Sequence, residues 1–164
     1  MKSLGVDILR SCPEGTMSFQ SVFQGFERVG AVHDTFGEST ERILRDLKVD
    51  VIETRGYLHI DPERGTIVVN RNYLREGQED YIYLDVVHEL VHIRQLMDGR
   101  ELFDRTYSYV DRPTEVEAYR VTIAEARRIG LSDEKIADYL KVEWVTEEDF
   151  KRFLHAMGVE NGRH

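Results

Sequence analysis

The chain has 164 residues but only one cysteine, Cys12, and three prolines. A single cysteine excludes an intrachain disulfide framework and a zinc ribbon with several cysteine ligands. Any metal site must therefore use histidine and carboxylate side chains. Basic residues are outnumbered by acidic ones, 22 to 31, which gives a formal net charge of −9. This balance argues against a broad surface for nucleic acid or an anionic membrane, because both need clustered lysine and arginine.

Long hydrophobic runs are also lacking. No stretch approaches the roughly 18 uncharged apolar residues that a membrane-spanning helix needs. The first ten residues are not expected to form a secretory signal, since Asp7 and Arg10 interrupt the apolar residues there. We therefore expect a cytoplasmic protein with no nucleic-acid and no membrane partner.

The composition, with 41% hydrophobic and 32% charged residues, is that of a folded chain. Its length suits one domain over residues 1–164. Apolar residues recur at helical spacing over 17–29, just before Gly30, and Ser39 or Thr40 is expected to cap a second helix. Helices are therefore predicted for the N-terminal part, to about residue 47.

A change of pattern follows these helices. Short β-prone runs cover 51–54, 57–60 and 66–70. The residues at 55–56, Arg-Gly, suit a tight hairpin between the first two runs, and the composition of 61–65 predicts a turn. We therefore expect a small antiparallel sheet.

The rest of the chain has helical periodicity, with capping residues between the segments. Gly99 is expected to end the first of these helices, and Pro113 fits the first turn of the second. The resulting order predicts an α+β fold rather than alternating βαβ units, with a core at about 50–130 and C-terminal helices at about 132–157. The predicted helices cover 80–97, 113–129, 132–140 and 146–157.

The most informative motif is His-Glu-x-x-His, formed by His88, Glu89 and His92 inside the predicted helix 80–97. Residues four apart lie on one helical face, so the two histidines can present imidazole nitrogens to one zinc ion. Glu89 projects about 100° away around the helix, where it is suited to hold a metal-bound water as general base. The motif therefore predicts a zinc site with Glu89 as its catalytic residue.

A zinc site of this type needs a third protein ligand. Acidic residues on the helix that begins at Pro113 are the best candidates, because the loop before it is long enough for two helices to pack side by side. Glu115 lies 23 residues after His92, and Glu117 points to a different side of the helix. One of the two is expected to bind the metal. The remaining histidines are scattered along the chain: His33, His59, His155 and His164.

These residues resemble the zincin metallopeptidases, in particular the branch with glutamate as third ligand. The small members of this branch include the minigluzincins and the peptidases related to phage-repressor-cleaving and DNA-damage-response regulators. The resemblance covers about residues 50–130 and rests on His-Glu-x-x-His and on the Glu-Val-Glu-Ala run at 115–118. It implies a zincin-like domain with a three-stranded sheet before the active helix. It also selects Glu115 as the zinc ligand and places Tyr119 where the family often has Asp or Asn.

The resemblance implies a zinc-dependent metallopeptidase that hydrolyses peptide bonds with a zinc-activated water, from which Glu89 takes a proton. Its partner would then be a peptide or protein substrate. The alternative is a zinc-binding regulatory or interaction module with the same fold, either latent or cutting a single partner protein. The oligomeric state is left open.

Three positions near the motif have open roles. Asp85 stands where the family usually has Val or Thr, three residues before His88. It is expected either to orient the imidazole from outside the metal site or to be a solvated acid on an exposed helix. Tyr107 and Tyr109, in the loop before Pro113, are candidates to stabilise an oxyanion.

Overall fold

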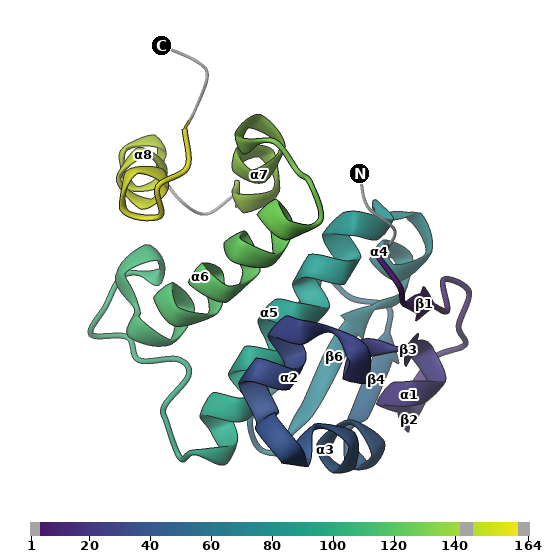
Figure 1. The fold of residues 1–164 in the computed structure, drawn as a ribbon. Helices are drawn as coiled ribbons and strands as arrows, with labels where there is room; N and C mark the ends of the chain where they lie inside the picture. The colour runs from purple at the N-terminus through teal and green to yellow at the C-terminus, as the bar shows by residue number, and fades with distance from the viewer. Residues whose placement is uncertain (1–3, 142–145, 161–164) are drawn as a thin grey trace.

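A long helix, α5 (Glu79–Met97), runs through the middle of the computed structural model, which describes residues 4–141 and 146–160. A mixed sheet packs on one side of α5, and helix α6 (Pro113–Arg128) packs on the other (Figure 1). Most residues of α5 are buried because neighbours cover it on several sides. The predicted α+β class is confirmed.

The sheet has four strands in the order β2–β4–β6–β5. Strand β6 (Thr66–Asn70) pairs in parallel with β4 (Lys48–Ile52) and antiparallel with β5 (Leu58–Asp61). Strand β2 (Gly15–Ser18) pairs antiparallel with β4. Strand β5 is therefore at an edge of the sheet, on the side that contacts α5.

The predicted antiparallel sheet with a hairpin at 55–56 is wrong, because β6 lies between β4 and β5. All five residues of β6 are buried, a pattern typical of a strand covered on both faces, and this strand takes the central place. The predicted turn at 61–65 is confirmed. There the Gly65 amide donates a hydrogen bond to the Asp61 carbonyl over 2.8 Å, and the φ of Gly65 is +65°.

The helix predicted over 17–29 is also wrong. Its apolar residues are buried as expected, but Gly25, with a φ of +91°, and a short strand interrupt the helical backbone. The segment consists of the end of β2, helix α1 (Phe19–Val22), strand β3 (Phe23–Gln24), which pairs with β1 (Asp7–Ile8), and the 3₁₀ turn η1 (Phe26–Arg28).

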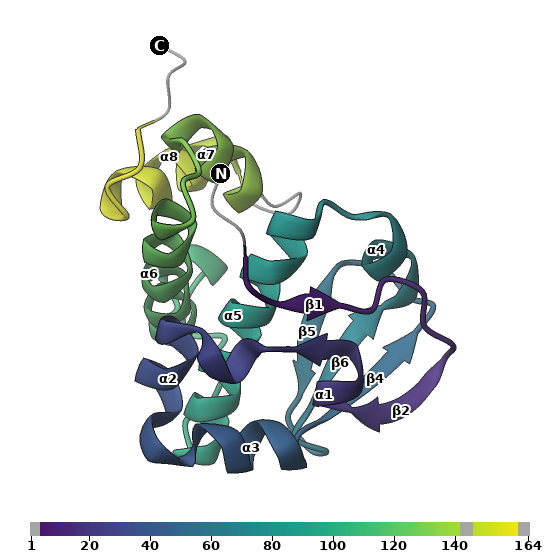
Figure 2. The same cartoon turned by 45° about the vertical axis from the view of Figure 1, so that its right-hand side comes forward.

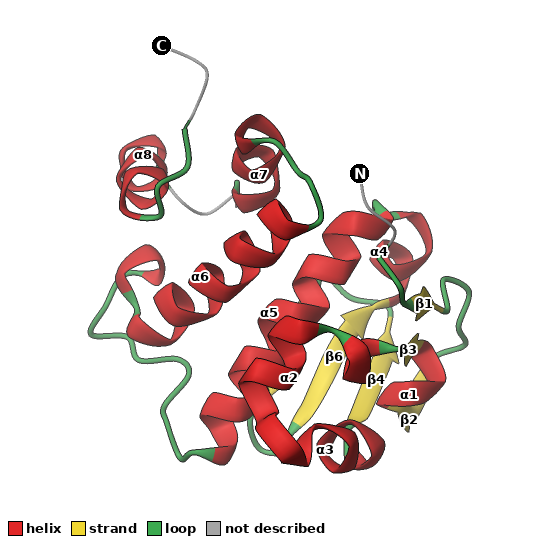
Figure 3. Cartoon of the chain, viewed as in Figure 1, coloured by secondary structure: helices red, strands yellow, loops and turns green. Residues whose placement is uncertain are grey.

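The remaining helices are coloured red in Figure 3. Helix α2 begins at Gly30, which the sequence suggested as a stop, and α4 was not predicted. Ser132 and Thr146 cap α7 and α8 as expected, accepting hydrogen bonds from the Lys135 and Asp149 amides. These elements are α2 (Gly30–Phe36), η2 (Gly37–Ser39), α3 (Thr40–Asp46), α4 (Arg71–Glu76), η3 (Tyr109–Asp111), α7 (Asp133–Leu140) and α8 (Glu147–Ala156).

The turned view shows α7 and α8 together at the upper end of α5 and α6, with α2 and α3 toward the lower end (Figure 2). Among the described residues, no helix combines the length and the apolar character needed to span a membrane.

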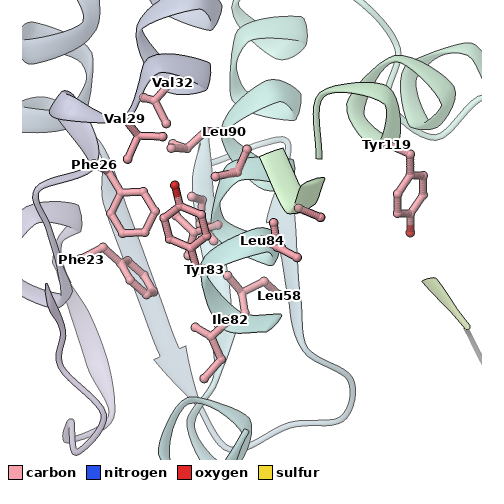
Figure 4. Packing of buried hydrophobic residues seen from close by; sticks show 14 of the residues in the cluster. Phe23, Phe26, Val29, Val32, Leu58, Ile82, Tyr83, Leu84, Leu90 and Tyr119 are labelled. Atoms are coloured by element: carbon pink, nitrogen blue, oxygen red, sulfur yellow. The ribbon is translucent and has the colours of Figure 1, made fainter. Parts of the chain in front are cut away.

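An aromatic cluster joins the N-terminal segment to α5. The rings of Phe26 and Tyr83 stack with centroids 5.5 Å apart, and Phe23 meets Phe26 edge to face at 6.0 Å. Figure 4 shows these rings with Leu84 and Leu90 of α5. Phe23, Phe26 and Tyr83 are completely buried. The cluster therefore anchors α5 from the side opposite its polar residues.

Replacing Phe26 with alanine should lower the free energy of unfolding by about 3–5 kcal/mol, because a buried ring is lost and a cavity remains. Urea denaturation measures this change. Phe103→Ala is the matched control, since Phe103 is 45% exposed and its loss should change stability by about 0.5 kcal/mol or less. Equal effects of the two substitutions would contradict the role given to the cluster.

Candidate functional site

His88, His92 and Glu115 meet where α5 packs against the first turn of α6. The two histidine Nε2 atoms are 3.2 Å apart, and Oε1 of Glu115 lies 3.0 Å from the first and 2.9 Å from the second. Tetrahedral ligand atoms at zinc-like bond lengths of about 2.1 Å are about 3.4 Å from one another. All three side chains are buried. This donor set is therefore spaced to hold one metal ion.

The loop between α5 and α6 brings Glu115 to this place. Thr114 donates from its hydroxyl to the Leu102 carbonyl, and Arg112 donates to the Asp104 carbonyl. Pro113 is the first residue of α6, so Glu115 lies in the first turn, where the helix dipole favours a carboxylate. The local sequence thus fixes both the start of α6 and the acid that faces α5.

Each histidine is oriented by a hydrogen bond to its other ring nitrogen. The amide nitrogen of Gln95 donates to the Thr114 carbonyl, which leaves its Oε1 to accept from Nδ1 of His92 over 2.7 Å. The Thr122 hydroxyl donates to the Ala118 carbonyl and so accepts from Nδ1 of His88 over 3.2 Å. Both rings therefore carry a proton on Nδ1, and both Nε2 atoms point toward Glu115.

Three converging lone-pair donors need a positive charge between them. Burial disfavours the charged form of His92, but the adjacent Glu115 carboxylate outweighs it and raises the pKa of His92 to about 9. Burial keeps the pKa of His88 low. For Glu115, the two histidines outweigh burial and lower the pKa of the carboxyl. In the metal-free protein a proton on His92 supplies the charge, in the place where a metal cation would supply it otherwise.

Glu89 lies beside this cluster in the wall of a cavity of about 390 Å³. It is 8% exposed, and no hydrogen bond reaches its carboxylate within residues 4–141 and 146–160. Burial raises the pKa of Glu89 to about 8, although His92 partly offsets this effect. The same cavity is lined by all three candidate ligands. Glu89 is therefore placed to exchange a proton with a group held near them.

Asp85 also lines the cavity but fits neither role suggested by the sequence. It is half-buried, and its two oxygens accept hydrogen bonds from the Tyr73 and Tyr139 hydroxyls, the latter over 2.7 Å. The outer ring nitrogens instead donate to Gln95 and Thr122, two partners that sequence reasoning missed. Gln95 is three residues after His92, and Thr122 is seven after Glu115, so helical spacing carries the signal for both.

Glu117 lies outside the cluster. Its carboxylate accepts from Arg100 over 2.9 Å and from the Gln95 amide over 3.0 Å. Of the two tyrosine candidates, Tyr107 is exposed, whereas Tyr109 lines the cavity. The Tyr109 hydroxyl is 2.7 Å from that of Tyr119, whose ring centroid lies 4.3 Å from that of His88. Figure 4 shows Tyr119 apart from the aromatic cluster.

Of the four remaining histidines, His59 lies on β5 and lines the cavity. His33 and His155 are on α2 and α8 and do not line it, and His164 lies outside the described residues. The structure therefore brings together His88, Glu89, His92 and Glu115 and leaves Glu117 and Tyr107 elsewhere.

In comparisons with known proteins, no family model, no curated protein and no solved structure matches this chain. The functional argument consequently depends on the geometry of the site.

Removal of Glu115 should abolish tight metal binding, whereas removal of Glu117 should not. With zinc as the probe, the wild type should bind about one ion per chain. Glu115→Ala should lose more than about 100-fold in affinity, beyond the 10–100-fold range expected when an outer hydrogen-bond partner is lost. Elemental analysis after dialysis and a competition titration measure both quantities. Equal losses in Glu115→Ala and Glu117→Ala would overturn the assignment of the ligand.

Zinc binding should depend on pH because coordination needs a neutral imidazole. The raised pKa of His92, about 9, means that this residue is protonated at neutral pH in the metal-free protein. The apparent affinity should therefore rise by about tenfold per pH unit as the pH increases from 7 toward 9, and then level off. Calorimetry in two buffers of different ionisation enthalpy counts the released protons. A zinc affinity that does not change with pH would argue against a proton on His92 in the metal-free protein.

Proposed function

We propose that this chain is a zinc-dependent metallopeptidase in which His88, His92 and Glu115 hold the metal. The observation that carries the proposal is that these three donors and Glu89 line one cavity, with both Nε2 atoms directed at the carboxylate. Two imidazoles and one carboxylate are a donor set typical of catalytic zinc. When bound, zinc supplies an acidic water and polarises a carbonyl group.

Glu89 would act as the general base and then as the acid. In its ionised form the carboxylate accepts a proton from the attacking water, and it later donates that proton to the amine that leaves. The buried position excludes bulk water from the carboxyl, which keeps its pKa near the working range. A cation held by the neighbouring ligands would favour the ionised form of Glu89.

The edge strand β5 offers a way to hold a peptide. Leu58, His59 and Ile60 line the cavity, and β5 pairs with β6 along one edge, while no described strand pairs with the other. The backbone groups on that free edge are available to an extended peptide, which would add to the sheet by β-augmentation. A peptide bound in this way would pass the metal ligands in an extended conformation.

The zincin-like fold is part of the same proposal. It is supported by the order of the elements: a sheet with an edge strand at the cavity, then α5 with the histidines, then α6 with the glutamate. The four-stranded mixed sheet differs from the three strands that the resemblance implied.

Glu89→Gln should retain about one zinc per chain but lower kcat for peptide cleavage by about 10²–10⁴-fold, because the variant cannot accept a proton. Mass spectrometry of a peptide mixture incubated with zinc-loaded protein measures cleavage. Glu79→Gln, an exposed position on the same helix, should cleave like the wild type.

Two results would contradict the proposal. Undiminished cleavage by Glu89→Gln would refute Glu89 as the base. A wild type that binds zinc stoichiometrically yet cleaves no peptide would favour the alternative, a zinc-binding regulatory or interaction module.

A further inference from the structure

The cavity extends beyond the metal ligands to Asp85, one turn before Glu89 on α5. Four residues of an α-helix advance about 6 Å along its axis, so the backbones of the two residues are separated by about that distance. Asp85 accepts hydrogen bonds from Tyr73 of α4 and Tyr139 of α7, and all three residues line the cavity. Two elements distant in the sequence thus hold one carboxylate in place beside the catalytic site.

The Asp85 carboxylate has acceptor capacity left. Each carboxylate oxygen can accept two hydrogen bonds, and each oxygen of Asp85 accepts one, from a tyrosine. Both donors are neutral. Within the described part of the chain no lysine or arginine forms an ion pair with Asp85 or with Glu89. Carboxylates that are withdrawn from solvent are normally paired with a cation, and no lysine or arginine among the described residues forms such a pair with Asp85.

Aromatic rings form the walls around Asp85. Tyr57 and Tyr73 meet edge to face with centroids 4.8 Å apart, and Tyr81 and Tyr139 meet in the same way at 5.2 Å. All four rings line the cavity. Because the Tyr73 and Tyr139 hydroxyls are turned to Asp85, the rings flank the space in front of it. Tyrosine rings next to a carboxylate favour a cation through the ring quadrupole as well as through charge.

The other charged residues of the cavity do not neutralise this end. Asp138 adds a second carboxylate, which accepts a hydrogen bond from Tyr81 over 2.7 Å. Arg112 donates to the Asp104 carbonyl and lies over the Tyr109 ring. Lys141 also lines the cavity, and no ion pair joins it to Asp85 in residues 4–141 and 146–160.

We propose that Asp85, with the tyrosines around it, forms a specificity pocket for a basic side chain, lysine or arginine, of the peptide substrate. The inference rests on the proposed peptidase function and adds the class of residue that the enzyme selects. The four-carbon stem of a lysine packs between the rings, and its ammonium group donates to the free lone pairs of Asp85. Glu89 remains available for catalysis.

Binding of small amides to the zinc-loaded wild type tests the pocket without any cleavage. N-acetyl-lysine methylamide has a charge only on its side chain, and N-acetyl-norleucine methylamide is its neutral analogue. By NMR titration the lysine amide should bind at least about 10-fold more tightly and shift the amide signals of Asp85 and its neighbours. Equal binding of the two amides would overturn the proposal. A third probe is alanine methylamide, which has a free amine. If this probe alone bound, the pocket would be one for a peptide N-terminus, and the proposal would be overturned as well.

The variant Asp85→Asn keeps the shape of the side chain and removes its charge. It should reduce the preference for the lysine amide to within about threefold. Asp98→Asn, an exposed position at the end of the same helix, should keep the wild-type preference. If Asp85→Asn does not fold, the comparison of the two amides on the wild type still decides the question.

Cleavage separates this inference from the proposed function. In a peptide mixture, kcat/KM should be about 10–100-fold higher for peptides with lysine or arginine at one fixed position than for those with norleucine there. Cleavage without this preference would refute the pocket and leave the peptidase function standing. Preferential binding of the lysine amide without any cleavage would support the pocket and refute the peptidase function.

Discussion

The site depends on two hydrogen bonds made by the side chain of Gln95. Its amide nitrogen donates to the Thr114 carbonyl in the first turn of α6, and its oxygen accepts from His92 on α5. One buried side chain therefore links the two helices and orients the ring of a candidate ligand. Because Glu115 follows Thr114 directly, the same contact determines where its carboxylate lies. A displacement of α6 along α5 would move Glu115 away from both histidines.

Several carboxylates line the cavity, and their charges determine what the cavity can bind. Glu89, Glu115 and Asp85 are carboxylates with little solvent, and their states differ because their neighbours differ. Two histidines keep Glu115 ionised, whereas burial favours the protonated form of Glu89. Burial also raises the pKa of Asp85, to about 6, against the effect of its two tyrosine donors. A cavity of this kind gains stability from cations that enter it, which is the common ground of the two proposals, a metal ion and a basic side chain.

How much of this structure the sequence predicts depends on how far apart in the sequence the interacting residues lie. His88, Glu89 and His92 share one helix, so a four-residue spacing is enough to place them together. The choice of Glu115 over Glu117 needs the packing angle between two helices, and it came from a family resemblance rather than from the spacing.

The order of the strands in the sheet could not be predicted from the local sequence pattern. The run at 66–70 has three consecutive apolar residues, Ile67–Val69, which suits a central strand, but tertiary pairing decides which strands it separates. In the same way the apolar spacing over 17–29 identifies residues that are buried, while Gly25 and the pairing of β1 with β3 decide the backbone. Asp85 has partners 12 residues before it and 54 after it, which no local rule connects.

The loop that joins α5 to α6 lines the cavity through Leu102 and Phe103 but supplies no candidate ligand. Every ligand lies on a helix that is held by buried contacts. The candidate ligands and this part of the cavity wall are thus supplied by different parts of the chain. Changes in the loop would alter the shape offered to a bound molecule while the candidate ligands keep their places, so the fold has an evolutionary route to new binding partners that leaves the candidate metal site intact.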